Sequence, residues 1–291
     1  GCPGRVHEDR MKNRAGSGEG HRRDGGLIAR RRKPLLGSHR GSRHLFDRWA
    51  QVSARLRAAR HVALFLDFDG TLLPLRRRPE DVWLDTGVRR RLARLARRRH
   101  VTVCLISGRQ LADLRRRARV AGVFYLGLHG WEREGKARQA TPEVLVRLKR
   151  SIGTGLAKLP GVWIEDKGFS LAIHYRGVPP AVVRRARLFL GECLKPHRGQ
   201  CRLLRGKKVW EILPAEVSGK GEAARNVLAR LGGSALPVYV GDDTTDEAAF
   251  EALRGGITVR VGPARRTKAR YRLRNPQEVG RLLERLEDET R

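Results

Sequence analysis

Two short segments made almost entirely of apolar residues set the strongest limit on how this chain folds. The first, 62–66, ends directly in Asp67, and the second, 101–106, ends in Ser107. A short apolar run that ends in a polar group is typical of a strand buried on both faces, as in a parallel sheet covered by helices. Both runs are far shorter than the ~18 residues that a membrane-spanning helix needs.

Strand and helix patterns alternate on either side of a middle region with a different pattern. Outside that region, strands are predicted at 61–67, 101–106, 123–126, 237–240 and 257–261, and helices at 45–60, 89–99, 220–231, 246–253, and from 110 and 276. Within 130–214, short half-apolar strands (162–165, 170–175, 202–204, 209–213) accompany helices at 142–159 and 180–195. Neighbouring half-exposed strands favour an antiparallel sheet with helices on one face. We therefore expect an α/β core, a doubly wound, Rossmann-like parallel sheet, interrupted by an α+β insert.

The charge of the chain makes nucleic acid the first partner to consider. Lys and Arg number 63 against 30 Asp and Glu, a formal charge of +33. The excess is spread along the chain instead of being gathered in one arm, and no Cys/His finger or RNA-binding aromatic motif accompanies it. We expect an arginine-rich solvated surface, with no specific nucleic-acid partner and only salt-sensitive attraction to polyanions.

The cysteines and the absence of a signal-like stretch indicate a reduced, intracellular environment. There are four cysteines, with no CxxC pair and no spacing typical of a zinc finger. Cys104 lies inside an apolar run, where we expect a buried thiol. The expectation is a soluble cytoplasmic monomer that does not associate with membranes.

The first buried segment ends in an acidic turn, Asp67-Phe68-Asp69-Gly70-Thr71. Because side chains alternate along a strand, Asp67 and Asp69 project to one side while Phe68 turns toward the core. Two carboxylates placed together repel each other unless a cation or a proton lies between them. A turn that closes a strand explains one aspartate and Gly70, but it does not explain both acids.

Further acids follow the strand predicted at 237–240. Asp242 and Asp243 come first, and we expect Thr244 and Glu247 to form a capping box for the next helix. That interpretation leaves Asp242 and Asp243 without a structural role. Carboxylates from two strand ends, with no Cys or His among them, favour a hard cation such as Mg²⁺.

These residue types fit phosphoryl transfer. Aspartate forms an acyl phosphate when it attacks phosphorus. A metal ion, the hydroxyl of Ser107 and the charge of Lys220 would neutralise the transferred group, which is nearly all that such a transfer needs. A second acid, Asp69, can protonate the departing oxygen and later activate water. The sequence therefore predicts an aspartyl-phosphate phosphatase or mutase.

The motifs, taken in order, resemble the haloacid dehalogenase-like hydrolases and, more closely, the trehalose-6-phosphate phosphatases. The core segments that carry this resemblance are Asp67–Pro74, Ser107–Arg109, Gly219–Gly221 and Gly241–Glu247. The more specific segments lie around and within the insert, at Gly127–Glu132, Glu165–Arg176 and Gly206–Ile212. The resemblance covers about 46–290. It implies a haloacid dehalogenase-like core at 46–130 and 215–291 and a mobile, substrate-reading cap at 131–214, and leaves 1–45 as a disordered basic extension.

The resemblance also implies catalytic roles. Asp67 would be the nucleophile and a Mg²⁺ ligand. Asp69 would be the general acid and base, with its main-chain carbonyl also facing the metal. Asp242 would bind the metal directly, while Asp246 would hold its outer shell. The catalytic set is completed by Ser107 and Lys220, which would hold the phosphoryl group.

The implied substrate contacts come from both the core and the cap. They are Thr71, Arg109, His129, Glu165, Lys167, Arg176, Lys207 and Glu211. Paired charged groups form strong, directional hydrogen bonds to sugar hydroxyls. An alternative for Glu165 with Lys167, and for Lys207 with Glu211, is ordinary cross-strand ion pairing on an exposed sheet. His174 could equally be a packed core residue.

The predicted function is Mg²⁺-dependent hydrolysis of trehalose 6-phosphate to trehalose and phosphate. Another sugar-phosphate phosphatase or a phosphohexomutase would share the core and differ in the cap. A basic nucleic-acid-binding protein on an inactive scaffold is a third possibility, which the presence of every core acid disfavours. Trehalose-phosphate synthesis is expected to lie on another chain.

Overall fold

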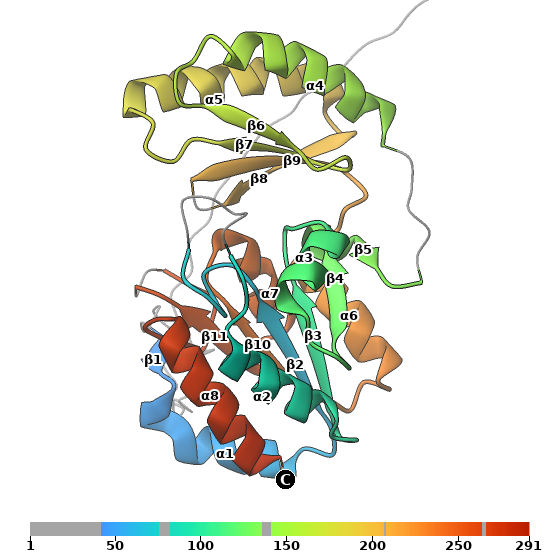
Figure 1. The fold of residues 1–291 in the computed structure, drawn as a ribbon, viewed down its shortest axis with the longest axis vertical. Helices are drawn as coiled ribbons and strands as arrows, with labels where there is room; N and C mark the ends of the chain where they lie inside the picture. The colour runs from blue at the N-terminus through green and yellow to red at the C-terminus, as the bar shows by residue number, and fades with distance from the viewer. Residues whose placement is uncertain (1–41, 76–81, 136–140, 207, 264–265, 291) are drawn as a thin grey trace, which may run out of the picture. The chain divides into compact units, whose positions relative to one another are not determined.

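The described residues form two separate β-sheets (Figure 1). The computed structural model describes residues 42–75, 82–135, 141–206, 208–263 and 266–290. The larger sheet has the strand order β1-β12-β11-β10-β2-β3-β4-β5, and the smaller has the order β6-β7-β9-β8. In the larger sheet every strand pair is parallel except β4 with β5. The expected α/β class with a parallel central sheet is confirmed.

The predicted apolar segments are the central strands of the larger sheet. These strands are β2 (Val62–Asp67), β3 (Val101–Ile106), β4 (Phe124–Gly127), β10 (Leu236–Gly241) and β11 (Ile257–Val261). Every residue of β2 and of β3 is buried. Cys104, at the middle of β3, is a free thiol whose pKa burial raises to about 12.

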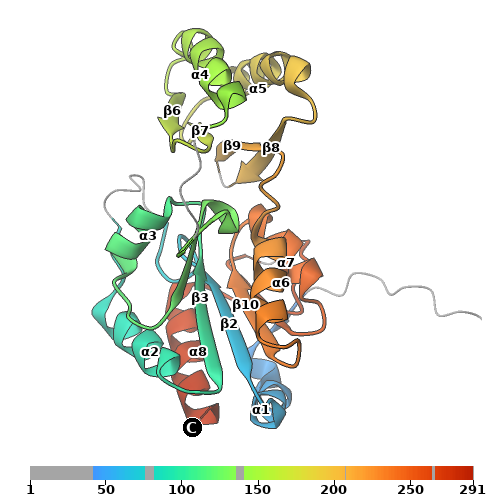
Figure 2. The same ribbon diagram turned by 90° about the vertical axis from the view of Figure 1, so that its right-hand side faces the viewer.

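Helices cover both faces of the larger sheet, as Figure 2 shows. Leu64 and Leu66 of β2 pack in one core with α1 (Trp49–Ala58), α2 (Thr86–Ala96), α3 (Leu111–Ala118) and α8 (Pro276–Glu289). Ala63 and Phe65 face the opposite way and pack with α6 (Lys220–Arg230) and α7 (Glu247–Ala252). This alternation explains why β2 is apolar along its whole length: both of its faces are buried.

The smaller sheet carries helices on one face only. It contains β6 (Trp163–Asp166), β7 (Leu171–His174), β8 (Cys201–Gly206) and β9 (Val209–Pro214), all paired antiparallel. Helices α4 (Glu143–Leu156) and α5 (Pro180–Leu194) pack against Ile173 and Ile212. We call this region, Glu143–Pro214, the inserted layer. Its other sheet face is left for the functional site.

Three short strands at or next to the edges of the larger sheet were missed by the sequence prediction. Arg43–His44 (β1) pairs with Tyr271–Leu273 (β12), and Leu45 is fully buried, so the core begins before residue 46. Glu132–Arg133 (β5) pairs with β4 and so belongs to the larger sheet, although the sequence placed it in the insert. Strands of two or three residues carry too little periodicity to be recognised from a pattern. Residues 1–41 lie outside the described part of the chain.

No helix in the part of the chain that the structure describes is long and apolar enough to cross a membrane.

Candidate functional site

Polar side chains gather where the central strands of the larger sheet end. Strands β10, β2 and β3 are neighbours and run parallel, so their carboxyl ends share one edge of the sheet. Asp67 is the last residue of β2, Ser107 follows β3, and Asp242 follows β10. All three side chains are buried. This edge is where ligands bind in open α/β sheets.

Three aspartates at this edge of the sheet lie close enough to share one cation. Each of Asp67, Asp242 and Asp246 offers a carboxylate oxygen within 4.8 Å of those of the other two, and all three are buried. Burial raises the pKa of Asp67 well above its usual value, and the neighbouring Asp246 and Asp242 raise it further, against the lowering effect of Lys220. A cation between the carboxylates would remove this repulsion.

Lys220 is the cation that the fold itself places in the cluster. Its Nζ donates to Asp67 Oδ1 at 2.6 Å and to Asp246 Oδ1 at 2.8 Å. Burial on its own lowers the pKa of Lys220, but Asp246 and Asp67 outweigh it and hold the pKa well above the usual value. Tyr239 also donates to Asp246 Oδ1, at 2.8 Å. Lys220 is therefore a fixed positive charge beside Asp67.

The turn after β10 is capped by its own aspartates, one residue earlier than the sequence suggested. Asp243 is the N-cap of a 3-10 turn (Thr244–Asp246), with Asp246 completing the capping box. Asp246 Oδ2 accepts from the backbone N–H groups of Asp242 and Asp243. The predicted box of Thr244 with Glu247 was wrong, because the turn begins directly at Thr244 and leaves Asp243 as the cap. Asp243, which had no expected role, is thereby explained.

Gly70 allows two strand ends to approach each other. Its φ is +88°, and a Cβ at this position would lie 2.3 Å from Asp242 Oδ2. Any other residue would meet both backbone strain and a direct clash with a carboxylate of the cluster. Gly70 is thus required both for the turn and for the place of Asp242.

Asp69 is not one of the three acids of the cluster and is bonded to an arginine instead. Its two carboxylate oxygens accept from Nε and Nη2 of Arg109, each at 2.7 Å. Arg109 also donates to Asp113 on α3 at 2.7 Å. The guanidinium of Arg109 therefore has carboxylates on two sides, which raises its pKa although burial opposes this. Metal binding through the main-chain carbonyl of Asp69 stays a prediction.

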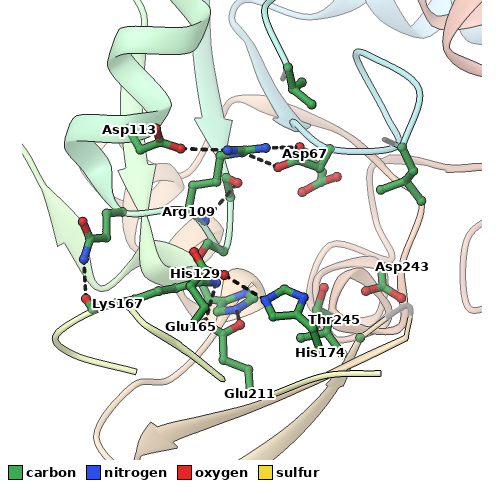
Figure 3. Close-up of a pocket in the computed structure, with 18 of the residues that line it drawn as sticks. Asp67, Arg109, Asp113, His129, Glu165, Lys167, His174, Glu211, Asp243 and Thr245 are labelled. Carbon is green, nitrogen blue, oxygen red and sulfur yellow. Dashed lines mark hydrogen bonds and ion pairs between the residues drawn. The ribbon is translucent and has the colours of Figure 1, made fainter. Parts of the chain in front are cut away.

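A cavity of about 1070 Å³ lies between the sheet edge and the inserted layer. Figure 3 shows Asp67, Arg109 and Asp113 at one side of it and Glu165, His174 and Glu211 at the other. The expected site residues that line the cavity are Asp67, Asp69, Ser107, Arg109, His129, Glu165, Lys167, Arg176, Glu211, Lys220 and Asp242. Its size is slightly above the ~300–1,000 Å³ usual for ligand sites.

Three expected site residues are absent from this list: Thr71, Lys207 and Asp246. Asp246, a member of the three-acid cluster, is fully buried. Thr71 is also fully buried, with no hydrogen-bond partner for its Oγ1 among the described residues. Lys207 lies outside the described residues.

Glu211 connects the inserted layer to the core. Its Oε2 lies 2.6 Å from His129 Nε2, and its Oε1 accepts from Lys167 at 3.1 Å and from Ser170 at 2.8 Å. Lys167 also donates to the carbonyl of Gly108, beside Ser107. Burial alone raises the pKa of Glu211, but Lys167 and His129 outweigh it and hold the pKa far below the usual range. Glu211 is therefore a buried, paired anion.

Of the two ion pairs considered in the sequence, Lys207 with Glu211 stays a prediction because Lys207 lies outside the described residues, and for Glu165 and Lys167 the structure shows other partners. Lys167 pairs with Glu211, and Glu165 accepts from His174 at 2.9 Å. His174 lines the cavity and is only partly buried, so it is not a core residue. Arg176 is exposed and lines the cavity.

Sequence reasoning missed several residues that position the site. Asp113 lies one helical turn after Arg109, a spacing that could have suggested the pair. Gln110 donates to the carbonyl of Lys167, and Ser170 to Glu211, across large sequence separations. Such long-range contacts leave no local pattern to detect.

The donor set fits a divalent cation. Three buried carboxylates face one lysine, so the cluster carries excess negative charge. Oxygen donors without Cys or His suit a hard ion.

The comparisons with known proteins agree with this fold and site. A haloacid dehalogenase-like hydrolase from Bacteroides thetaiotaomicron superposes with a TM-score of 0.55 at 16% identity, over 78% of this chain and 99% of the other. The chain therefore has the fold of the haloacid dehalogenase-like hydrolases. Residues 65–277 match the model of the trehalose-phosphatase family. The chain belongs to the trehalose-phosphatase family.

Relatives of known name extend over most of the chain. A trehalose-phosphate phosphatase from Mycobacterium avium is 36% identical over 258 residues, 80% of this chain and 63% of the relative. A probable trehalose-phosphate phosphatase D from Arabidopsis thaliana is 30% identical over 86% of this chain and 73% of its own length. The chain spans only 19% of an uncharacterized glycosyl hydrolase from Mycobacterium tuberculosis, at 37% identity.

Solved structures of similar proteins share the fold. The trehalose-6-phosphate phosphatase of Aspergillus fumigatus superposes with a TM-score of 0.62 at 27% identity, over 85% of this chain and 99% of the other. The C-terminal domain of the Candida albicans enzyme superposes with a TM-score of 0.71 at 23% identity, over 81% and 96%.

Proposed function

We propose that this chain hydrolyses trehalose 6-phosphate to trehalose and phosphate. The observation that carries the proposal is the cavity itself, which has a phosphoryl-transfer cluster on the sheet edge and charged side chains on the inserted layer opposite. The names of relatives that match most of the chain support the same substrate.

Asp67 is the proposed nucleophile. Lys220 holds its Oδ1 at 2.6 Å and so fixes the rotation of the carboxylate. An oxygen of Asp67 attacks phosphorus, the bond from phosphorus to the sugar oxygen breaks, and an aspartyl phosphate forms. Ser107, buried at the end of β3, and Lys220 donate to the phosphoryl oxygens.

Asp69 is the proposed general acid and base. It protonates the departing sugar oxygen, then takes a proton from the water that attacks the aspartyl phosphate and releases phosphate. In the structure both of its oxygens are held by Arg109. The carboxylate of Asp69 is therefore engaged in an ion pair with Arg109, and substrate binding must loosen that pair before Asp69 can transfer a proton.

Mg²⁺ is the proposed cofactor. Asp67 and Asp242 would hold it directly, with Asp246, already bonded to Lys220 and to two backbone N–H groups, behind them. When bound, the ion neutralises charge on the transferring phosphoryl group.

The inserted layer, residues 131–214 in the sequence prediction, is proposed as the cap that reads the sugar. Glu165, Lys167, Arg176 and Glu211 line the cavity and present charged groups suited to sugar hydroxyls. Lys207, outside the described residues, is proposed to act with them. A cytoplasmic location and a monomeric state stay predictions.

Phosphate release tests the proposal and separates it from its rivals. Trehalose 6-phosphate, sucrose 6-phosphate and glucose 6-phosphate are compared with Mg²⁺ and with EDTA. We expect turnover of the first, lost in EDTA and restored by Mg²⁺. Asp67→Asn should abolish turnover without unfolding the protein, whereas Asp47→Asn, whose side chain is 76% exposed, is the matched control. Preference for another ester would assign a different sugar-phosphate phosphatase, and an active Asp67→Asn variant would remove Asp67 as nucleophile.

A further inference from the structure

Trp163 is a large aromatic side chain that the fold leaves open inside the cavity. It lies at the start of β6, is 48% exposed and lines the cavity. Trp83, Phe124, Val146 and Leu188 are comparably exposed but do not line it in the described part of the chain. An exposed indole in a cavity that also carries charged side chains has an unused apolar surface.

Strand register explains why Trp163 faces the cavity. Trp163 and Glu165 alternate with Ile164, which packs toward the helices of the inserted layer. Trp163 lies directly opposite His174 on β7, and Ala172 on the same face lies opposite both Glu165 and Glu211. The face that carries Trp163 is therefore the face that carries the charged groups of the cap.

The ring of His174 covers one face of the indole. The imidazole and indole rings are stacked, with centroids 3.9 Å apart and planes at 9°. His174 Nε2 is in turn held 2.9 Å from Glu165 Oε2. With one indole face covered and the ring fixed, the exposed surface of Trp163 is pre-organised for a flat ligand.

The surroundings indicate what kind of ligand would cover this surface. A pyranose ring has an apolar face of C–H groups and a rim of hydroxyls. The C–H groups carry partial positive charge and are attracted to the negative face of an aromatic ring. Glu165 and Arg176, which line the cavity with Trp163, offer charged partners for the hydroxyls.

We propose that Trp163, backed by His174, is a stacking platform for the sugar ring that does not carry the phosphate. The inference rests on the proposed function and adds the residue that selects a disaccharide phosphate over a monosaccharide phosphate. The phosphate would lie across the cavity, beside Asp67 and Lys220 on the larger sheet. Strand β6 is separated from β9 by β7, which places it about 10 Å from the strand of Glu211. The platform is thus displaced from the contacts that join Glu211 to the core.

Substitution of Trp163 tests the platform with substrates of different size. Trp163→Ala should lower kcat/KM for trehalose 6-phosphate about tenfold, the loss of ~1.4 kcal/mol of stacking, and should leave glycerol 3-phosphate turnover unchanged. Trp163→Phe should retain most of the activity. Phe124→Ala, an exposed aromatic outside the cavity, is the matched control. Equal losses of kcat/KM on both substrates, or no loss on either, would overturn the proposal that Trp163 stacks on the sugar.

His174 is a positioning residue, and its test separates KM from kcat. His174→Ala should raise KM for trehalose 6-phosphate and leave kcat unchanged, because the indole loses its support while the chemistry is untouched. His174→Phe should restore KM in part, since a flat ring again covers the indole while the hydrogen bond to Glu165 stays lost. A fall in kcat, or no rescue by phenylalanine, would contradict this role.

Failure of the proposed function would be seen separately. If the wild-type protein does not hydrolyse trehalose 6-phosphate, the proposed function is wrong. Calorimetric titration with trehalose then tests whether Trp163 binds a sugar ring. Weaker binding of trehalose by Trp163→Ala than by the wild type would support it. Equal binding, or no binding by the wild type, would overturn it.

Discussion

Replacement of Glu211 by glutamine removes one charge from the most heavily bonded anion between the two sheets. The side chain is 8% exposed and is joined to Lys167, His129 and Ser170. Glutamine keeps the shape and can still accept from Ser170. It removes the ion-pair partner of the Lys167 ammonium, whose side chain is 13% exposed, and leaves Glu165 as the remaining acid with the largest effect on its pKa. The substitution therefore tests the charge and not the packing.

The expected loss follows from the burial of this pair. Removing one partner of a buried ion pair costs about 3–5 kcal/mol. Because Lys167 keeps some exposure and a bond to the carbonyl of Gly108, we expect the lower end, about 3 kcal/mol. For a chain of this size that corresponds to a fall in Tm of about 6–12 °C.

Thermal unfolding without substrate measures the effect. Glu192→Gln is the control, since its side chain is 76% exposed and pairs with Lys195 at 3.6 Å; it should change stability by less than about 1 kcal/mol. In the double variant with Lys167→Met, the loss should be smaller than the sum of the single losses by about 1–3 kcal/mol. Strictly additive losses, or a Tm equal to that of the control, would refute a buried and coupled Glu211.

Two further predictions concern pH and the Gly70 turn. The pKa of Glu211 in the folded protein is held below its unfolded value of about 4.3, so its contribution to stability is complete above that pH and is lost as the pH falls. The difference in unfolding free energy between the wild type and Glu211→Gln should therefore shrink from pH 7 to pH 3. A difference that does not change with pH would contradict the ion pairing of Glu211. Gly70→Ala should reduce phosphatase activity about 100-fold, because a Cβ would displace Asp242. Gly232→Ala, with a similar positive φ of +74° but no atom within 4 Å of the added Cβ, isolates backbone strain and should keep its activity; equal activity losses in both variants would show that the contact with Asp242 is unimportant.

Local patterns were enough to predict the main elements and the acidic ends of the strands. The apolar segments that became β2 and β3 had to be buried on both faces, and a parallel sheet is the arrangement that buries them. Since the strands of a parallel sheet all end at one edge, Asp67, Ser107 and Asp242 were expected at that edge, but only the sheet topology shows that β10 lies directly beside β2. The cap at the 3-10 turn was misplaced by one residue because Asp243 and Thr244 are both good N-cap residues.

The partners of the charged groups were decided only by tertiary structure. Nothing local to Asp69 shows that Arg109 holds both of its oxygens, and nothing near Glu211 shows that His129 is its closest partner. These contacts join segments far apart in the chain, so their geometry depends on how the inserted layer lies over the sheet edge.

Sequence alone determined which residue types stand at the strand ends, because burial and side-chain alternation act over a few neighbouring residues. The register of the strands could not be predicted from the sequence alone. A shift of one residue would turn Trp163 and Glu165 toward the helices and Ile164 toward the cavity. Packing of α4 and α5 against Ile173 and Ile212 fixes that register, and with it the face that meets a substrate.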